Sequence, residues 1–160
     1  MRVAIAGTPG CGKTTVAKIL AKKIHFRHLN INRLIKSKRL YSGFDKKRKA
    51  YIADVGKIKK FLKTVKGDVI LDSHLSYLLN PDVVFVLMCR PDILVKRMKK
   101  RKWRQRKINE NIEAEMIGLI LWEAKKSCKK VFEIDTTKKT PSQVAKKIES
   151  LLKIYLSQYP

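Results

Sequence analysis

The segment from residue 7 to residue 14 constrains the fold of this chain more than any other stretch. It is Gly7-Thr8-Pro9-Gly10-Cys11-Gly12-Lys13-Thr14, which fits G-x-x-x-x-G-K-[ST], the pattern of a loop that cradles phosphate groups. The apolar run 3–6 before the loop predicts a buried parallel strand, and apolar residues at helical spacing over 16–24 predict a helix after it. The alternative, an ordinary glycine-rich turn, is much less favoured in this context. The pattern therefore predicts an α/β fold that binds a nucleoside triphosphate.

The chemistry of a triphosphate site gives each part of the loop a role. Its glycines permit a turn in which successive N–H groups point at phosphate oxygens, and the helix that opens near Lys13 adds free N–H groups and the positive end of its dipole. We expect Lys13 to neutralise the β- and γ-phosphates and the Thr14 hydroxyl to bind Mg²⁺. Mg²⁺ with ATP is the predicted cofactor, and the loop residues predicted to bind ATP are Gly10, Cys11, Gly12, Lys13, Thr14 and Thr15.

A second candidate group follows the apolar run 69–71. Asp72 ends this predicted strand, where α/β folds place their ligands, so it is a candidate Mg²⁺ ligand beside Thr14. The alternative is an aspartate that terminates a strand at a turn, and the phosphate loop upstream favours the metal ligand. His74 either orients a phosphate or an attacking water, or caps the following turn; the sequence leaves both open.

The hydrophobic pattern along the chain predicts alternating strands and helices. Residues 41–45 are interpreted as a turn before the basic run 46–49, and one long helix is expected over 108–127 with Ile112, Met116, Leu119 and Ile120 on its core side. Thr140 and Gln143 are interpreted as the capping box of the last helix. This pattern predicts one domain over 1–160, a three-layer α/β sandwich of the P-loop NTPase type around a five-stranded parallel sheet. The five expected strands are 3–6, 28–31, 69–72, 83–88 and 131–134.

The charge of the chain is its most unusual bulk property. Lysine and arginine number 38 against 13 acidic residues, a formal net charge of +25. Such an excess favours polyanionic partners such as RNA, or reflects a lysine-rich proteome of the kind found in thermophiles; both interpretations stay open. Three cysteines without metal-ligand spacing favour a reduced compartment, and the first strand begins directly after Met1. We expect no signal peptide, no membrane partner and a cytoplasmic location, or a nuclear one if the source is eukaryotic.

Several further stretches carry a resemblance to a known family. Together with the phosphate loop, they resemble the nucleoside monophosphate kinases, and more closely the adenylate kinase isoenzyme six-like family, kinase/ATPases implicated in small ribosomal subunit maturation. The similarity extends from Arg2 to about Lys126. The stretches that carry it are 7–15, 40–45, 72–74, Arg97 with Arg101, and 111–115.

This resemblance implies a monophosphate-binding insert at about 30–53 and a short lid at about 100–110. It implies that Asn30 and Lys36 bind the monophosphate, with a lysine at 36 where these kinases usually carry arginine. Arg97 would lie against adenine, Arg101 on the ATP phosphates, and Lys138 in the loop at the adenine edge; an exposed basic helix face is the alternative for the arginines. The implied catalytic residues are Lys13, Asp72, Arg101 and His74.

The activity implied by the resemblance is phosphoryl transfer from ATP to AMP, giving two ADP, with intrinsic ATPase activity. The implied setting is small ribosomal subunit and rRNA maturation, with ATP, AMP and a small-subunit ribosomal protein or pre-rRNA as partners. One alternative is an ATP-switched assembly factor that binds a ribosomal protein and has little kinase activity. Another is a kinase for a different small nucleoside or nucleotide. The sequence does not indicate an oligomeric state.

Overall fold

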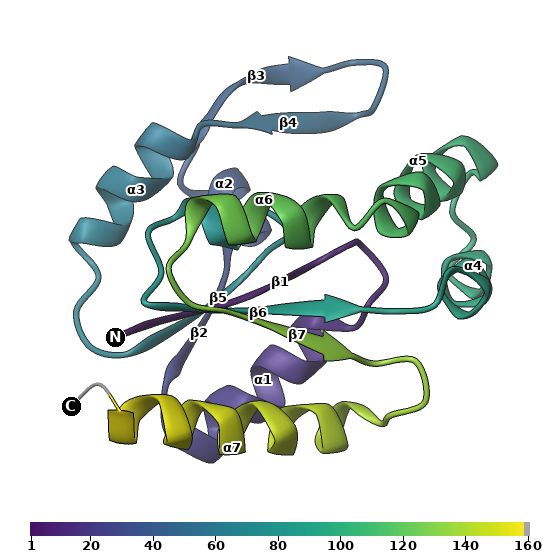
Figure 1. Cartoon of the computed structure of the whole chain (residues 1–160). Coiled ribbons are helices and arrows are strands. Elements are labelled where there is room, and N and C mark those ends of the chain that lie inside the picture. The colour runs from purple at the N-terminus through teal and green to yellow at the C-terminus, as the bar shows by residue number, and fades with distance from the viewer. Residues whose placement is uncertain (159–160) are drawn as a thin grey trace.

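A five-stranded parallel sheet forms the centre of the computed structural model, which describes residues 1–158. Its strand order is β2–β5–β1–β6–β7, and helices cover both faces (Figure 1). This confirms the predicted three-layer α/β sandwich. After β1 the chain adds β2 and β5 on one side of it, and later β6 and β7 on the other. The strand order therefore reverses at β1, and such a switch point is where folds of this type bind ligands. The strands are β1 Arg2–Gly7, β2 Arg27–Asn30, β5 Val69–Asp72, β6 Val83–Met88 and β7 Val131–Asp135.

Three helices, α2, α3 and α7, begin at residues whose side chains satisfy free backbone N–H groups. Asn30 caps α2 by accepting from Arg33 N at 2.9 Å, and Asp54 caps α3 by accepting from Lys57 N at 2.9 Å. Thr140 and Gln143 form the predicted capping box of α7, with reciprocal bonds of 3.3 and 2.9 Å. The helices are α1 Lys13–Ile24, α2 Ile31–Ser37, α3 Val55–Lys63, α4 Pro91–Lys100, α5 Gln105–Met116, α6 Leu119–Ser127 and α7 Pro141–Gln158, with a short 3₁₀ turn, η1 Ser76–Leu78.

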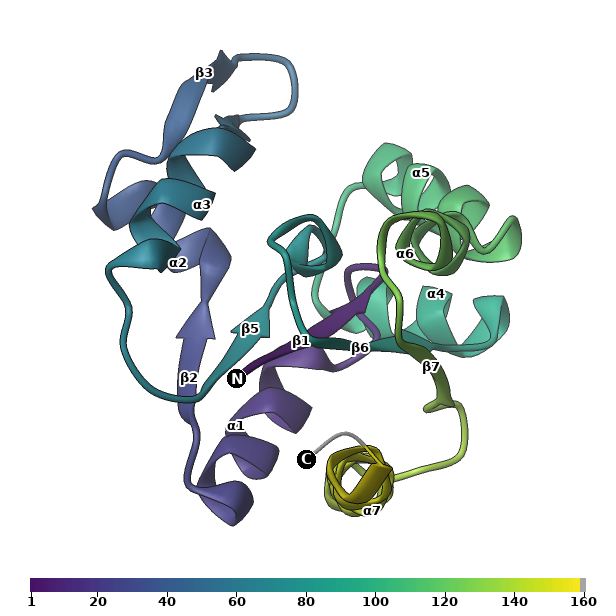
Figure 2. The ribbon, with the colours of Figure 1, turned by 60° about the vertical axis from the view of Figure 1, so that its left-hand side comes forward.

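The core lies on both faces of the sheet because successive residues of a strand point to opposite sides. In β1, Val3 and Ile5 pack in the cluster formed with α1 and α7, whereas Ala4 and Ala6 pack in the cluster that includes Ala124 of α6. Figure 2 shows α1 and α7 on one side of the sheet and α6 on the other. Since β1 is buried on both faces, it is a continuous apolar run with no polar alternation.

A β-hairpin replaces the turn expected over 41–45. This stretch is strand β3 (Tyr41–Asp45), which pairs antiparallel with β4 (Ala50–Ala53), and the basic run 46–49 is the turn between them. Aromatic rings hold the two strands together, because Tyr51 lies 4.4 Å from the Tyr41 ring centroid and 5.2 Å from that of Phe44. The prediction of a turn was wrong. Gly43 and Asp45 are typical turn residues, but both lie in β3, where pairing with β4 holds the chain extended.

The single helix expected over 108–127 is two helices. Gly118 has a φ of 62° and separates α5 from α6, a left-handed conformation that favours glycine. The break changes the direction of the helix face, so Met116 is 69% exposed and Leu119 36% exposed, and their predicted core positions are wrong. Ile112 and Ile120 are partly buried against the core, as expected.

Among residues 1–158, no helix combines the length and the apolar character that a membrane crossing requires.

Candidate functional site

The phosphate loop joins the carboxyl end of β1 to the first turn of α1. Gly7 must be glycine, because its φ is 135° and a Cβ there would lie 2.4 Å from the carbonyl oxygen of Leu87 on the neighbouring strand. Beyond the loop, α1 begins at Lys13, and no side chain among residues 1–158 caps its first turn. The free N–H groups of this turn are therefore available to an anion.

A cavity of about 540 Å³ opens over this loop. Its walls come from the loop, the ends of β2 and β5, α2, the hairpin and the segment that follows α4. The structure brings most of the predicted site residues together here, from segments far apart in the chain. The predicted residues that line it are Gly10, Gly12, Lys13, Thr14, Thr15, Asn30, Lys36, Asp72, His74 and Arg101.

Lys13 folds back over its own loop. Its Nζ donates to the carbonyl oxygen of Thr8 at 3.1 Å. Burial lowers the pKa of Lys13, and the nearby Arg101 charge acts in the same direction, whereas Cys11, Asp72 and Glu115 oppose the shift. An ammonium group that is partly stripped of water gains most from a nearby phosphate, so the position suits an anchor for a polyanion.

Asp72 is held at the carboxyl end of β5 by two side chains of the adjacent strand β2. Its Oδ2 accepts from Asn30 Nδ2 at 3.0 Å and lies 3.1 Å from His28 Nε2, and the carboxyl group is 2% exposed. Sequence reasoning missed His28. The signal was its place two residues before Asn30, on the same face of a strand, but the pairing of that strand with β5 has no local signature.

The oxygen donors present fit Mg²⁺ bound together with a nucleotide. Thr14 and Asp72 both line the cavity, and Mg²⁺ prefers one or two protein oxygens plus phosphate oxygens and water. Within the described residues, no cluster of three or more His, Cys, Asp or Glu side chains could hold a metal ion by itself. The donor set therefore suits a cation that arrives with a triphosphate.

His74 lines the same cavity without adding to its charge. Burial, and then the positive charge of Lys13, lower the pKa of His74 to about 4. The imidazole is therefore neutral at pH 7 and can exchange hydrogen bonds with a phosphate or a water.

Glu115 connects the phosphate loop to α5, the helix that begins within the predicted lid. It is 6% exposed; its Oε2 accepts from the Thr8 hydroxyl at 2.5 Å and its Oε1 from the backbone N–H of Cys89 at 2.6 Å. One carboxyl group of α5 thus joins the loop to the end of β6. Sequence reasoning gave Glu115 no role, since its position in a helix rich in charged residues hides its burial.

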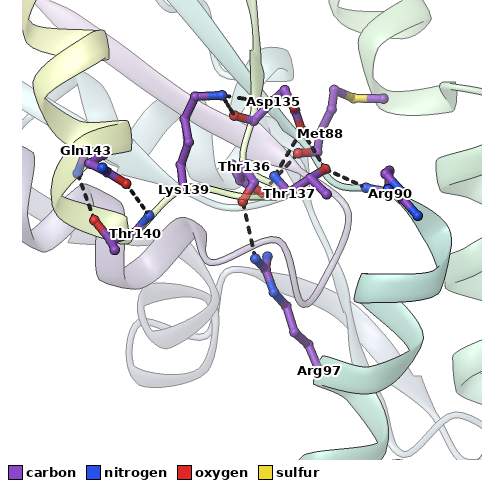
Figure 3. A network of polar contacts seen from close by, with 9 residues as sticks. All are labelled: Met88, Arg90, Arg97, Asp135, Thr136, Thr137, Lys139, Thr140 and Gln143. Carbon is purple, nitrogen blue, oxygen red and sulfur yellow. Dashed lines mark hydrogen bonds and ion pairs between the residues drawn. The ribbon is translucent and has the colours of Figure 1, made fainter.

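Three predicted ATP-binding residues do not line the cavity. Cys11 is buried below the loop, where burial first and the Glu115 charge second raise the pKa of its thiol to about 12. Arg97 lies beside the loop after β7, and its Nη2 donates to Thr136 O at 3.3 Å (Figure 3). Lys138 of that loop is exposed. The loop itself is ordered by Thr136, which donates to Met88 O from both its N–H and its hydroxyl, at 2.8 and 2.9 Å.

The cavity is also lined by aromatic and basic side chains to which sequence reasoning gave no individual role. Tyr51 of the hairpin, Trp103 after α4 and Lys107 of α5 all line it. Lys107 Nζ lies 3.8 Å from the centroid of the Trp103 ring, and Arg101 Cζ lies 5.9 Å from it. Trp103 interrupts a basic run, and that interruption was the signal available in the sequence.

Comparison with known proteins identifies the family of the chain. The family model described as "AAA domain" matches residues 3–118. A protein named "Putative adenylate kinase" from Methanocaldococcus jannaschii is 38% identical over 96% of this chain and 86% of its own length. One of the same name from Methanosarcina acetivorans is 40% identical over 98% of this chain and 89% of its length. These relatives are archaeal, which gives no support to a nuclear location.

Solved structures share the fold at low sequence identity. Shikimate kinase from Acinetobacter baumannii superimposes with a TM-score of 0.65 at 15% identity, over 99% of this chain and 94% of that one. Shikimate kinase from Bacteroides thetaiotaomicron gives a TM-score of 0.59 at 15% identity, over 96% and 98% of the two chains. With near-complete coverage by relatives at 38–40% identity, the chain belongs to the adenylate kinase-like family of P-loop proteins.

Proposed function

We propose that the chain transfers the γ-phosphoryl group of ATP to AMP, giving two ADP, and hydrolyses ATP slowly when no acceptor is bound. The observation that carries this proposal is that the phosphate loop, Asp72, Asn30, Lys36 and the hairpin all line one cavity. Its volume of about 540 Å³ lies in the range of small-molecule sites. The names of the archaeal relatives support a nucleotide acceptor.

The proposed chemistry rests on positioning and charge neutralisation, because phosphoryl transfer needs little covalent help from a protein. The loop N–H groups and Lys13 would hold the donor phosphates, Lys36 the acceptor phosphate, and Arg101 the charge that develops between them. Thr14 and Asp72 would hold Mg²⁺, which would supply further neutralisation of the phosphate oxygens. His28 and Asn30 keep the Asp72 carboxyl group oriented toward that position. Arg97 and Lys138 are assigned to the adenine side, around the loop after β7.

A coupled assay with each nucleoside monophosphate tests the kinase reaction. ADP formation should accelerate most with AMP; if no acceptor raises it above the rate of hydrolysis, the kinase half of the proposal is wrong. Lys36→Met removes a charge-assisted phosphate contact of about 1.5–3 kcal/mol, so the KM for AMP should rise roughly 10–100-fold while hydrolysis without AMP persists. Lys38→Met is the matched control, because Lys38 is exposed and does not line the cavity.

Calorimetry of the Lys13→Ala variant tests nucleotide binding separately. Loss of the ammonium group should weaken Mg-ATP binding by at least tenfold. If the variant binds Mg-ATP as tightly as the parent chain, the phosphate-loop assignment fails, whatever the acceptor assay shows.

A second candidate function is that of an ATP-switched assembly factor for the small ribosomal subunit. The observation in its favour is that the hairpin and the segment after α4 line both the phosphate-loop cavity and a second, neighbouring cavity that is rich in lysine and arginine. Bound nucleotide can therefore change the surface that the chain offers to a ribosomal protein or pre-rRNA. Pull-down of small-subunit proteins with and without ATP, at low and moderate salt, tests it. Capture that ignores nucleotide and vanishes with modest salt would contradict it.

A further inference from the structure

A second cavity, of about 610 Å³, adjoins the phosphate-loop cavity and shares four lining residues with it. Three of its cationic side chains come from the turn of the β3–β4 hairpin (Lys47, Arg48 and Lys49). Four more come from the other side, at the start of α5 and just before it (Lys102, Arg104, Arg106 and Lys107). Two segments more than fifty residues apart in the chain thus present like charges across one groove, which we call the basic groove.

The charge of the basic groove exceeds what the composition of the chain explains. Seven of its twelve lining residues are lysine or arginine, against 38 of 160 in the whole sequence. Two of the seven cations have an acidic partner: Glu110, which lines the groove, lies 3.1 Å from Arg106 Nε, and Asp45, which does not, lies 4.0 Å from Arg48 Nη1. Because like charges repel across the groove, the arrangement gains most from a ligand that carries several negative charges along its length.

An aromatic ring lies among these cations. Trp103 is half-buried and lines both cavities, so its indole lies where the basic groove meets the phosphate-loop site. Lys107 Nζ lies 3.8 Å from the centroid of this ring, so a base that stacks on the same face would displace the ammonium group toward the phosphates of the strand. Bases of a single strand stack on such rings while lysine and arginine neutralise the backbone. The bases of a duplex are already stacked on one another, and inorganic polyphosphate has none, so neither ligand would use Trp103.

We propose that the basic groove binds a single-stranded polynucleotide, with phosphodiester groups between the hairpin turn and the start of α5 and a base on Trp103. The proposal gives a location to the RNA contact in the second candidate function above, but it requires neither a ribosome nor phosphoryl transfer. Pro9, Ala50, Trp103 and Lys107 line both cavities, so the strand would pass the mouth of the ATP site.

Fluorescence titration with a uridine decamer tests the proposal. Trp122, the other tryptophan, is 60% exposed and carries Lys126 over its ring at 5.1 Å, so Trp122→Phe leaves Trp103 as the only reporter. The decamer should change the Trp103 emission and bind with a steep salt dependence. If a thymidine decamer binds as tightly as the uridine decamer, the groove accepts single strands of both DNA and RNA. If the thymidine decamer binds more weakly, the groove is specific for RNA. Polyphosphate of equal charge that binds as tightly as the decamer would overturn the proposal.

A matched pair of triple variants separates the basic groove from the general charge of the chain. Each phosphate contact contributes a factor of about 5 at 0.1 M salt, so changing Lys47, Arg48 and Lys49 to Gln should weaken decamer binding about 100-fold and lower the salt slope by about 2. The control changes Lys125, Lys126 and Lys129 to Gln, which removes the same charge from exposed positions that do not line the groove. Equal losses in both triples would overturn the proposal.

Nucleotide binding distinguishes this proposal from the kinase proposal. The hairpin triple variant should bind Mg-ATP with unchanged affinity, because none of its three side chains lines the phosphate-loop cavity. Lys13→Ala should bind the decamer as the parent chain does, since Lys13 does not line the basic groove. If the parent chain does not bind the decamer, the proposal for the basic groove is wrong. The assignment of the phosphate-loop site is then unaffected, because the nucleotide-binding and acceptor assays test it separately.

Discussion

The bonds of Glu115 offer the sharpest test of how the phosphate loop is supported. The carboxyl group is buried and accepts one bond from the Thr8 hydroxyl and one from the Cys89 N–H. Glu115→Ala removes both acceptors and leaves a buried backbone N–H group and a buried hydroxyl without their partner. Glu115→Gln keeps an oxygen for Cys89 and places an amide donor beside the Thr8 hydroxyl, so it preserves most of the geometry.

The size of the effect follows from the two bonds. A hydrogen bond to a charged group contributes about 1.5–3 kcal/mol, so Glu115→Ala should lower the free energy of unfolding by about 3–6 kcal/mol. Glu115→Gln should lower it by about 1–2 kcal/mol, since only the charge and one donor orientation change. Because Thr8 belongs to the phosphate loop, the alanine variant should also bind Mg-ATP more weakly, whereas the glutamine variant should bind it nearly as the parent chain does.

Urea unfolding and calorimetry with Mg-ATP measure the two effects. Glu113→Ala is the matched control, because Glu113 belongs to the same helix and is exposed, and surface changes of this kind stay within about 0.5 kcal/mol. Thr8→Val combined with Glu115→Ala should cost less than the sum of the single changes, with a coupling of about 0.5–3 kcal/mol. If Glu115→Ala unfolds at the same urea concentration as Glu113→Ala, the reasoning about this link is refuted.

Three further predictions concern other parts of the fold. Gly118→Ala should lower the free energy of unfolding, measured in urea, by about 1–2 kcal/mol, because a φ of 62° is strained for a residue with a Cβ. Crowding is not the cause, since no heavy atom of residues 1–158 outside the immediate neighbours lies within 4 Å of a Cβ built there. An unchanged stability would show that the break between α5 and α6 is not fixed. Thr140→Ala should cost about 1 kcal/mol by the same measurement, and Thr140→Ser should restore most of it, since the hydroxyl caps α7. Cys11, whose thiol has a pKa raised to about 12, should react with maleimide at pH 8 more than 100-fold slower in the native chain than in urea, as followed by mass spectrometry; equal rates would contradict its burial.

The main sheet could be predicted from the sequence because its signals are local. The apolar runs of β1, β5 and β6 are buried on both faces, so each is visible without knowledge of its neighbours. The hairpin was missed because β3 and β4 are half-exposed and pair only with each other. The division of α5 from α6 depends on one glycine in an otherwise helical pattern, and such a glycine is compatible with either a continuous or a broken helix.

The candidate site likewise contains residues that a local motif identifies and residues that no local pattern identifies. The loop residues follow from a motif with fixed spacing, and the structure brings Lys13, Thr14 and Asp72 around one cavity. His28 and Glu115 could not be found in this way, because their importance lies in contacts with residues 44 and 107 positions away in the chain. A helix that carries Glu110, Glu113 and Glu115 gives no local sign of which carboxyl group is buried.

The hairpin has a consequence for how this protein could change its acceptor. It is a two-stranded sheet of its own, and such a pair is only marginally stable in isolation. Asp54 N donates to Leu40 O at 3.1 Å and closes the base of the hairpin, and Lys57 Nζ of α3 donates to Tyr41 O at 2.9 Å. At the same base, Tyr41 and Ala53 pack against the core. One wall of the cavity is therefore anchored in the central sheet, while the opposite wall is a short appendage. If the proposed function holds, mutations can remodel that appendage for a new acceptor during evolution without disturbing the wall proposed to bind the triphosphate.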